Sequence, residues 1–495
     1  MRIHNFFTSL TLLALLATAG CKKFLDVKPK GLDIIRTTEQ YNGLFNNSTL
    51  FSFANFRTTS AGVTAILGNA DNIVFMGDEV VTSLPYINAK IESQQNAFKW
   101  ADNIYLPDEE AHDWGSFYAQ MYIYNKVIDS VMGSEGGTEQ KKRELKAEGR
   151  ANRAFNYLIA SNFYGQPYRT STANTDLAVP LVTTADATAG NFTRATVREL
   201  YDFIIADLQA AIPDLPANIY SRVRMSRPAA QYILGMVYFF MSDYANALTY
   251  LNQAKAALTS STIPMALYDY NTIMLSWVNA ATPHRGASGY PLQYNSTENF
   301  FLKQLSMSLS IVNTSTLLIK PSVLALFGPT DTRLKMYYNK DYITGGNKLY
   351  YLNNPADTVF CSARNSPSTV NWGPNLPNLY LMLAECKARA NDLAGAKAEL
   401  ETLRNKRMPA SDAIVPVTTQ EAMVRFVLAE RQREFAATGY RWFDMRRLWD
   451  DPVYGNTIDP SHRIDGTTYT LRRERLTMRI PPQVMAYNPG MTDNP

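Results

Sequence analysis

Aromatic rings that stand close to amide groups are the side chains of this chain with the clearest chemistry. Trp100 is followed three residues later by Asn103. An indole ring can stack on the apolar face of a pyranose, and an amide can both donate to and accept from the hydroxyl groups of the sugar. This spacing predicts a non-catalytic sugar contact. The alternative is that Trp100 anchors the core of the first helical pair.

A second aromatic set lies further along the chain, at Trp277, Tyr290 and Tyr294. The residues around these rings are polar and rich in turn formers, which is typical of an exposed segment. Stacking contributes about 0.5 to 1.5 kcal/mol per aromatic pair beyond burial, so two or three rings would give weak, reversible capture. These three residues are therefore further candidates for contact with a ligand.

A charged stretch near the C-terminus combines carboxylates and arginines that could do acid–base chemistry. The alternative is that arginine forks pair with the carboxylates and lock two packed helices together. We favour this structural interpretation. The residues concerned are Glu430, Arg431, Glu434, Arg441, Asp444 and Arg446.

A second acidic group, Asp108 to Glu110 with His112 and Asp113, could hold a metal ion or form a glycosidase pair. Its spacing matches no metal-binding loop, so we favour solvated acids that cap the helix beginning near Trp114. The histidines of the chain are His4, His112, His284 and His462, and none lies four residues from another histidine or a cysteine. The sequence therefore predicts no metal, no cofactor and no serine-type triad.

An apolar run that ends in small residues before Cys21 is typical of a bacterial lipoprotein signal. The apolar stretch covers 10–17, and the small residues Thr-Ala-Gly occupy 18–20. This run is far too short to cross a hydrocarbon core of about 30 Å. We predict a signal peptide over 1–20, lipidation of Cys21 and an extended tether over 21–40, which attach the protein to a membrane outside the cytoplasm. The alternative is an ordinary secretory signal that ends near a cysteine.

Charge, hydropathy and cysteine content exclude several classes of protein. Lysine and arginine total 48 and aspartate and glutamate 44, so removing Arg2 with the signal leaves 47 − 44 = +3, which is too balanced to indicate nucleic-acid binding. No later segment has the roughly eighteen uninterrupted apolar residues of a membrane-spanning helix. Cys386 lies in a helical pattern that favours a buried, inert thiol, so no disulfide with Cys361 is expected.

Hydrophobic spacing predicts a mainly α-helical chain, built as a scaffold of about four tetratricopeptide-like helix pairs. Gly235 would let the two helices of its pair approach closely, and Thr418 with Glu421 fits a capping box. A further helix is expected over 38–56, and the irregular stretch 259–374 is interpreted as a loop-rich inserted subdomain. The pairs are predicted near 114–165, 197–258, 375–407 and 418–449, within one domain over 41–495.

Short motifs in a characteristic order extend over nearly the whole chain. They are Cys21 with the segment 23–29, Met76 to Glu79, Trp114 to Asn125, Arg150 to Gly165, Tyr380 to Glu385, Glu430 to Glu434 with Gly439 to Arg447, and Ile480 to Pro482 with Asn488 to Gly490. Together these motifs resemble the SusD/RagB family of outer-membrane nutrient-binding lipoproteins of Bacteroidetes. The resemblance implies four tetratricopeptide units with a loop-rich subdomain. It also implies that Trp100 and Asn103 match the sugar-contacting pair of the starch-binding family member.

The resemblance further implies a function and a partner. The expected ligand is an oligosaccharide, or in some relatives a peptide, and the expected partner is a SusC-like TonB-dependent barrel in the outer membrane. The expected location is the cell surface, although Lys22 and Lys23 beside the lipidated cysteine do not themselves indicate the leaflet.

Two other classes stay open from the residues alone. An anchored glycoside hydrolase would need two carboxylates roughly 5 to 9.5 Å apart across an aromatic cleft. A pure assembly scaffold would bind another protein on its concave helical face and carry no small ligand.

Overall fold

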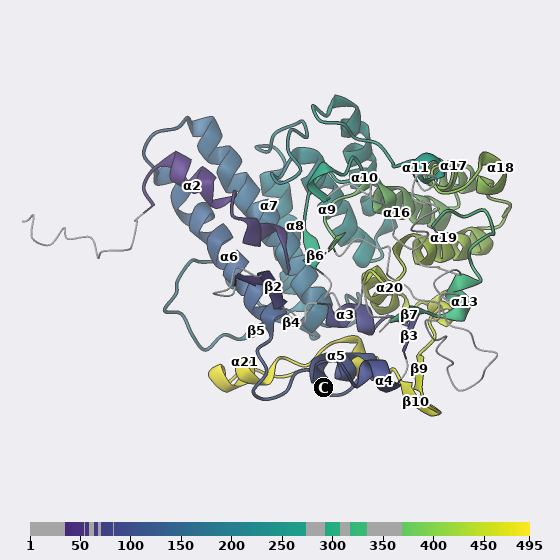
Figure 1. The fold of residues 1–495 in the computed structure, drawn as a ribbon. Coiled ribbons are helices and arrows are strands. Elements are labelled where there is room, and N and C mark those ends of the chain that lie inside the picture. Colours follow the sequence, from purple (N-terminus) through teal and green to yellow (C-terminus); the bar gives the residue numbers. More distant parts are fainter. Residues whose placement is uncertain are drawn as a thin grey trace, which may run out of the picture.

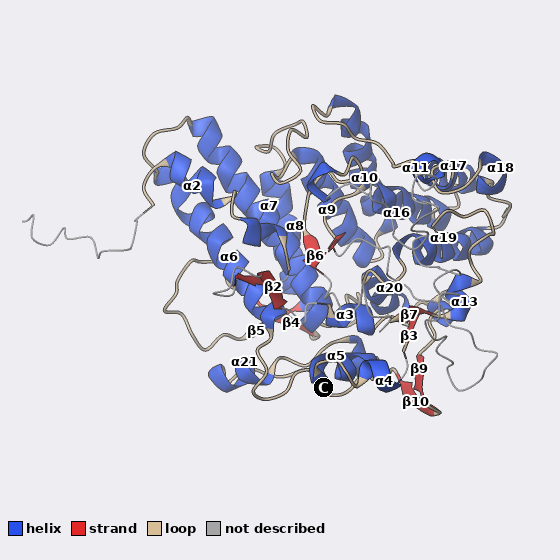
Figure 2. Ribbon diagram, in the orientation of Figure 1, coloured by secondary structure: helices blue, strands red, loops and turns tan. Residues whose placement is uncertain are grey.

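The computed structural model of the chain describes residues 35–53, 55–58, 64–67, 71–82, 84–273, 293–306, 317–333 and 369–495. Helices dominate these residues, and their strands are short and paired two by two (Figure 2). The mainly α-helical class expected from the sequence is therefore confirmed. In these parts of the chain, no helix combines the length and the apolar character needed to cross a membrane. The predicted signal peptide and Cys21 lie outside the described residues.

The longer helices form an array in which successive helices pack against one another. They are α6 (His112–Ser130), α7 (Glu139–Tyr164), α8 (Val197–Ala211), α9 (Arg227–Phe240), α10 (Tyr244–Ala257), α16 (Leu376–Arg389), α17 (Leu393–Arg404), α19 (Gln420–Phe435) and α20 (Tyr440–Leu448). Contacts run from α6 to α7, α8, α9 and α10 in turn, and continue through α16, α17, α19 and α20. Figure 1 shows this array from the α6 and α7 pair at one side to α17 and α19 at the other.

Two of the helix pairs turn in the same way, which supports the predicted repeat. Ser242 between α9 and α10 has a φ of 60°, and Asn391 between α16 and α17 has a φ of 61°. In each turn the next residue is an aspartate whose carboxylate accepts a hydrogen bond from the first turn of the following helix. These caps are Asp243 and Asp392, and they satisfy backbone amides that a helix start leaves unpaired.

Close packing of α9 on α10 depends on Gly235. A Cβ atom at this position would lie 2.7 Å from Cγ of Leu251, well inside van der Waals contact. The close approach expected from the small residues of this pair is therefore confirmed.

Short elements connect and cover the array. The short helices are α2 (Thr38–Leu44), α3 (Asn72–Phe75), α4 (Leu84–Ile87), α5 (Glu92–Phe98), α11 (Tyr270–Ile273), α13 (Pro321–Leu324), α18 (Ala410–Ala413) and α21 (Pro482–Tyr487). The strands are β1 (Asn55–Thr58), β2 (Thr64–Leu67), β3 (Val80–Val81), β4 (Leu177–Pro180), β5 (Arg194–Thr196), β6 (Gln304–Ser306), β7 (Leu318–Ile319), β8 (Thr369–Asn371), β9 (Ser461–Ile464) and β10 (Thr467–Thr470). They pair antiparallel as β1 with β2, β3 with β7, β4 with β5, β6 with β8, and β9 with β10. In Figure 1, α4, α5, α21, β9 and β10 lie below the array.

One hydrophobic core runs through the array and includes the described parts of the predicted inserted subdomain. Phe300, Leu305 and Trp372 belong to the same buried cluster as the helices. Gln304 at the start of β6 also forms a bridge with Ser52 near the N-terminus. The described parts of 259–374 therefore share the core of the scaffold, and the subdomain boundary stays a prediction.

A second, smaller cluster fixes the N-terminal residues 35–53 to the C-terminal half of α6. It contains Tyr41 and Phe45 from the N-terminal side and Tyr124 and Val127 from α6. The part of the chain that follows the predicted tether is thus packed directly on the longest helix pair.

Two helix limits differ from those expected from the sequence. The helix expected over 38–56 ends at Leu44, because Asn47 accepts a hydrogen bond from the amide of Thr49 and opens a separate turn. The cap of α19 is Thr419 in place of Thr418, since its hydroxyl accepts from the amide three residues later. Either threonine could cap this helix, so the sequence alone could not choose between them.

Candidate functional site

Trp100, the first of the predicted sugar contacts, lies in the core. The residue is 3% exposed, and its Nε1 atom donates a hydrogen bond to the carbonyl oxygen of Met76 over 3.0 Å. The indole also stacks on His462, with 3.8 Å between the ring centroids. A pyranose could reach this ring only by displacing buried neighbours. The burial of Trp100 favours the core alternative, and sugar contact by this residue stays a prediction.

His462 explains why Trp100 is held in this place. The imidazole stacks on Phe98 as well, with 4.2 Å between centroids. Its Nδ1 atom lies 2.7 Å from the carbonyl oxygen of Phe98 and its Nε2 atom 2.9 Å from that of Gly77. Burial lowers the pKa of His462 to about 4, against the two carbonyl contacts, which raise it. This stack joins β9 to α5 and serves the fold.

The other predicted ligand residues lie on the surface or outside the described parts of the chain. Asn103 is exposed, and its Oδ1 atom accepts a long hydrogen bond of 3.5 Å from Nη1 of Arg479. Tyr294 is 54% exposed. Trp277 and Tyr290 lie outside the described residues. Ligand contact by these residues stays a prediction, and the structure does not place an open aromatic ring beside Asn103 at the position expected.

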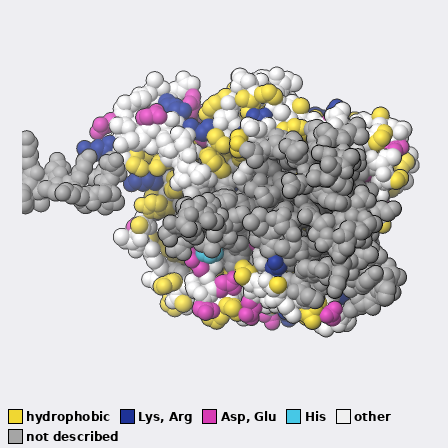
Figure 3. All heavy atoms as spheres, viewed as in Figure 1, with side chains coloured by type: hydrophobic (Ala, Val, Ile, Leu, Met, Phe, Trp, Pro, Cys, Tyr) yellow, Lys and Arg dark blue, Asp and Glu magenta, His cyan; other side chains and the backbone are white. Residues whose placement is uncertain are grey.

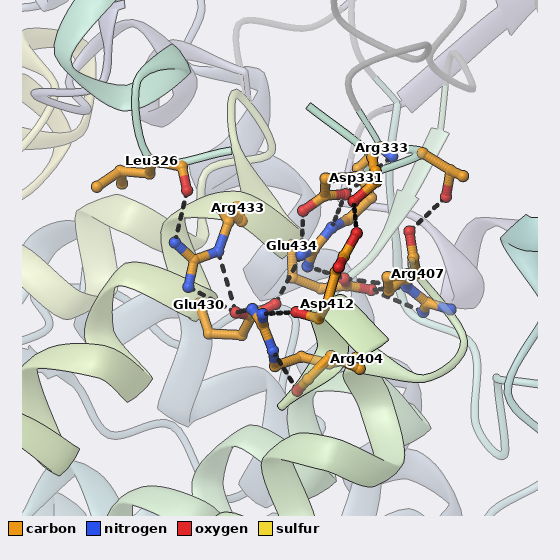
Figure 4. Close-up of polar contacts among 12 residues, drawn as sticks. Leu326, Asp331, Arg333, Arg404, Arg407, Asp412, Glu430, Arg433 and Glu434 are labelled. Carbon is orange, nitrogen blue, oxygen red and sulfur yellow. Dashed lines mark hydrogen bonds and ion pairs between the residues drawn. The ribbon is translucent and has the colours of Figure 1, made fainter. Parts of the chain in front are cut away.

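The charged stretch near the C-terminus forms a buried ion-pair network (Figure 4). Glu430 is fully buried and pairs with Arg333, Arg404 and Arg433 over 2.6 to 2.7 Å. Burial by itself raises the pKa of Glu430, but the three guanidinium groups hold it well below its ordinary value. A carboxylate kept ionised by three arginines is unsuited to proton transfer near neutral pH. The structural interpretation of these residues is therefore supported.

The neighbouring helix α20 repeats this arrangement. Asp444 pairs with Arg431 over 2.8 Å and with Arg447 over 2.9 Å. Arg441 pairs with Asp78 over 2.6 Å and so ties α20 to the segment before β3. These ion pairs position helices and leave their carboxylates engaged.

The acidic group 108–110 does not converge on one point. Glu109 accepts a hydrogen bond from the hydroxyl of Ser93, whereas Asp113 is buried and accepts one from Tyr164 over 2.8 Å. Burial raises the pKa of Asp113 to about 6. Over the described ranges, no three potential metal ligands from histidine, cysteine, aspartate or glutamate come together.

A cavity of about 320 Å³ lies between the N-terminal half of α6, the loop after β4, and α21, and we call it the aromatic cavity. Trp114 and Tyr118 of α6 line it, with 5.0 Å between their ring centroids. Tyr122 and Tyr487 also line it and are 42% and 83% exposed. The remaining lining residues are Met121, Pro180, Val182, Thr184, Asp186, Ala189, Phe192, Val484, Asn488 and Met491.

Hydrogen bonds hold the walls of the aromatic cavity in place. The hydroxyl of Tyr118 donates to the carbonyl oxygen of Pro180 over 2.9 Å. Asn125 donates to two carbonyl oxygens of the loop after β4, over 3.0 and 3.1 Å. The amide of Phe192, at the end of that loop, donates to Oδ1 of Asn488 over 3.0 Å. The cavity is therefore formed before any ligand arrives, which lowers the entropic cost of binding.

The chemistry of the aromatic cavity is stacking and apolar contact. Burial raises the pKa of Tyr118 well above its ordinary value, so this hydroxyl stays neutral. Among the described residues that line the cavity, Asp186 alone carries a formal charge, and hydrogen bonds from Thr188 lower the pKa of its carboxyl. In Figure 3, hydrophobic and acidic side chains are interspersed along the lower edge of the visible face, where α5 and α21 lie.

Sequence reasoning missed this cavity, although one signal for it was present. Trp114, Tyr118 and Tyr122 follow one another at intervals of four residues, which places three aromatic rings on one face of α6. Trp114 and Tyr118 also pack on the core, whereas Tyr122 is 42% exposed, so the stripe runs from the core to the surface.

Two family models match the chain. Residues 23–239 match a SusD-like family described as starch-binding and associating with the outer membrane, and residues 346–495 match the SusD family. No curated protein matches the chain.

Solved structures with the same fold cover almost all of the chain. A SusD superfamily protein from Bacteroides fragilis is 21% identical with a TM-score of 0.67, and the match covers 93% of this chain and 100% of that one. A SusD superfamily protein from Bacteroides vulgatus is 19% identical with a TM-score of 0.67, covering 93% and 99%. A putative sugar binding protein from Bacteroides vulgatus is 19% identical with a TM-score of 0.64, covering 94% and 99%. At these identities the likeness is one of fold.

Proposed function

Because the chain belongs to the SusD/RagB family, we propose that it captures oligosaccharides at the outer membrane and delivers them to a SusC-like TonB-dependent barrel, without catalysing a reaction. The observation that carries this proposal is the pair of family matches, one to each end of the chain. The first of them is described as starch-binding and associating with the outer membrane.

Lipidation at Cys21 supplies the attachment to the membrane in this proposal. Two-signal lipid anchors hold a protein stably on a bilayer, and confinement raises the effective concentration at which it meets a partner in the same membrane. The packing of residues 35–53 on α6 supports the proposal, because the chain that follows the predicted tether is held on the scaffold.

The carboxylates of α19, α20 and the aromatic cavity support a role in binding. Glycoside hydrolysis needs one carboxylic acid and one carboxylate on either side of a sugar bond. The carboxylates of α19 and α20 considered above are paired with arginines, and the aromatic cavity is lined by a single carboxylate, that of Asp186. The aromatic cavity is our candidate for the place where part of the ligand lies.

Binding and uptake can be tested separately with one variant. The purified Cys21→Ala protein should bind at least one oligosaccharide on a glycan array, and calorimetry should reproduce the interaction. In cells, the same variant should leave the outer membrane fraction and fail to support growth on that glycan. Loss of oligosaccharide binding together with binding of peptides would overturn the glycan part of the proposal, and growth of the variant at the wild-type rate would overturn the anchored role.

The partner needs an experiment of its own. The lipidated protein should co-purify with a TonB-dependent barrel after mild detergent extraction, identified by mass spectrometry. Recovery of the protein without any outer-membrane barrel would contradict the proposed delivery step.

A further inference from the structure

Three polar side chains of the aromatic cavity, those of Asn488, Asp186 and Tyr118, are already engaged within the protein. Asn488 accepts from the amide of Phe192 through Oδ1 and donates to the carbonyl oxygen of Val484 through Nδ2. Asp186 accepts from both the amide and the hydroxyl of Thr188. The hydroxyl of Tyr118 is likewise committed to a backbone carbonyl oxygen. The rest of the lining is mainly aromatic rings, methionines and aliphatic side chains, so a ligand group that enters the cavity meets a mostly apolar wall.

This mostly apolar wall disfavours a sugar ring inside the cavity. A sugar hydroxyl that is buried without a partner loses its hydrogen bonds to water, which weakens binding. An apolar group carries no such penalty, and removing its surface from water favours binding. The wall therefore selects for an apolar group.

The volume of the cavity sets the size of that group. A dry cavity of roughly 150 Å³ is enough to take up benzene. The aromatic cavity holds about 320 Å³, so it has room for a ring with a short side chain. Met121 and Met491 line it, and the flexible thioether of methionine adapts to the outline of an aromatic guest.

The rim of the aromatic cavity is more exposed to water than its interior. The rings of Tyr122 and Tyr487 are 42% and 83% exposed, so both can stack on a sugar that stays in contact with water. Taking these observations together, we propose that the aromatic cavity binds an aryl ester or similar aromatic substituent of a glycan, while the rim tyrosines stack on the sugar that carries it. This inference rests on the proposed function, because it assumes that the captured ligand is a glycan.

Aryl glycosides and their methyl counterparts test the inference with the sugar held constant. The probes are 4-nitrophenyl and methyl glycosides of each sugar that binds, together with methyl ferulate as the aromatic group alone. We expect the aryl glycosides to bind at least ten-fold more tightly than the methyl glycosides in calorimetry. Equal affinities for the two would overturn the inference and leave the proposed function in place.

Ala189 offers a variant that fills the cavity and a matched control. It lines the cavity from an exposed loop, so a larger side chain there can occupy the space without disturbing the core. Ala189→Trp should remove the preference for aryl glycosides, whereas Ala189→Ser should keep it. An unchanged preference in the tryptophan variant would place the aromatic group elsewhere.

Rim variants separate stacking on the sugar from capture of the substituent. Tyr487→Ala should weaken binding of aryl and methyl glycosides alike. The control is Tyr220→Ala, because Tyr220 is 44% exposed and does not line the cavity; this variant should change neither affinity. If no glycan binds, the proposed function fails, and methyl ferulate alone decides whether the cavity takes an aromatic group. Absence of methyl ferulate binding in that case would refute the inference as well.

Discussion

Lys303 is a buried lysine whose environment predicts a specific dependence of stability on pH. It is 1% exposed, and its amino group contacts the carbonyl oxygen of Leu50 over 2.8 Å, the hydroxyl of Tyr124 over 3.1 Å and Oε1 of Gln120. Burial lowers the pKa of Lys303 to about 7. The amino group donates to all three of these oxygen atoms, and none of the three carries a charge that would offset the cost of burying an ammonium group.

The lowered pKa of Lys303 sets the direction and the size of the change in stability with pH. Between pH 7 and the ordinary value of 10.5, the unfolded chain binds a proton at this lysine that the folded chain does not. The free energy of unfolding therefore rises with pH across this window, by about 1.4 kcal/mol per unit, and the gain is lost as pH falls toward 7. Lys303→Met removes the titrating group. The acceptors that methionine leaves unsatisfied cost a constant amount, which does not depend on pH.

The assay is urea unfolding of wild type and Lys303→Met, followed by tryptophan fluorescence at pH 7.5, 8.5 and 9.5. The difference in free energy of unfolding, wild type minus variant, should increase by roughly 2 to 3 kcal/mol over this range. Lys397→Met is the control, because the side chain of Lys397 is 44% exposed, and its difference from wild type should stay flat. A difference for Lys303→Met that is flat or decreases with pH would refute the reasoning.

Three further changes test the scaffold. Glu430→Ala should lower the free energy of unfolding by about 3 to 5 kcal/mol, because it leaves buried arginines unpaired. Glu421→Ala, which removes an exposed ion pair, should lower it by less than about 1 kcal/mol. Equal effects of the two variants in urea unfolding would contradict this prediction. Gly235→Ala should lower the free energy of unfolding by roughly 1 to 3 kcal/mol, because the new methyl group would overlap Leu251, even though alanine is the better helix former. A raised melting temperature of this variant would exclude the close approach of α9 and α10. Because burial lowers the pKa of His462 to about 4, wild type should lose stability relative to His462→Phe as pH falls from 6.5 to 4.5, and a constant difference would count against a buried neutral imidazole.

The scaffold was predictable because its signals are local. α8 begins at the capping box of Thr196 and Glu199 and spans Val197–Ala211, as the sequence indicates. Asp243 and Asp392 likewise mark helix starts by residue type alone. The ion-pair network was also foreseen in kind, since arginines and carboxylates at helix spacing pair more often than they catalyse.

The candidate site was not predictable in the same way, because its parts come from distant segments. A tryptophan three residues before an asparagine gives the same sequence pattern whether the tryptophan is exposed or buried. The burial of Trp100 depends on His462, a residue far along the chain. The aromatic cavity joins α6, the loop after β4 and α21, and only the stripe of Trp114, Tyr118 and Tyr122 is visible within one segment.

Helix α6 contacts both the aromatic cavity and the segment that follows the predicted tether. Trp114 and Tyr118 in its N-terminal half line the aromatic cavity, and Tyr124 and Val127 in its C-terminal half pack against the segment that follows the predicted tether. A helix rises about 1.5 Å per residue, so Tyr118 and Val127 lie roughly 14 Å apart along its axis. Because α6 is continuous between them, a change that unwinds this helix should disturb both the proposed ligand capture and the contact with the segment that follows the predicted tether. A change confined to the loop after β4 should disturb capture alone, which makes this loop the part of the site that can vary with the ligand.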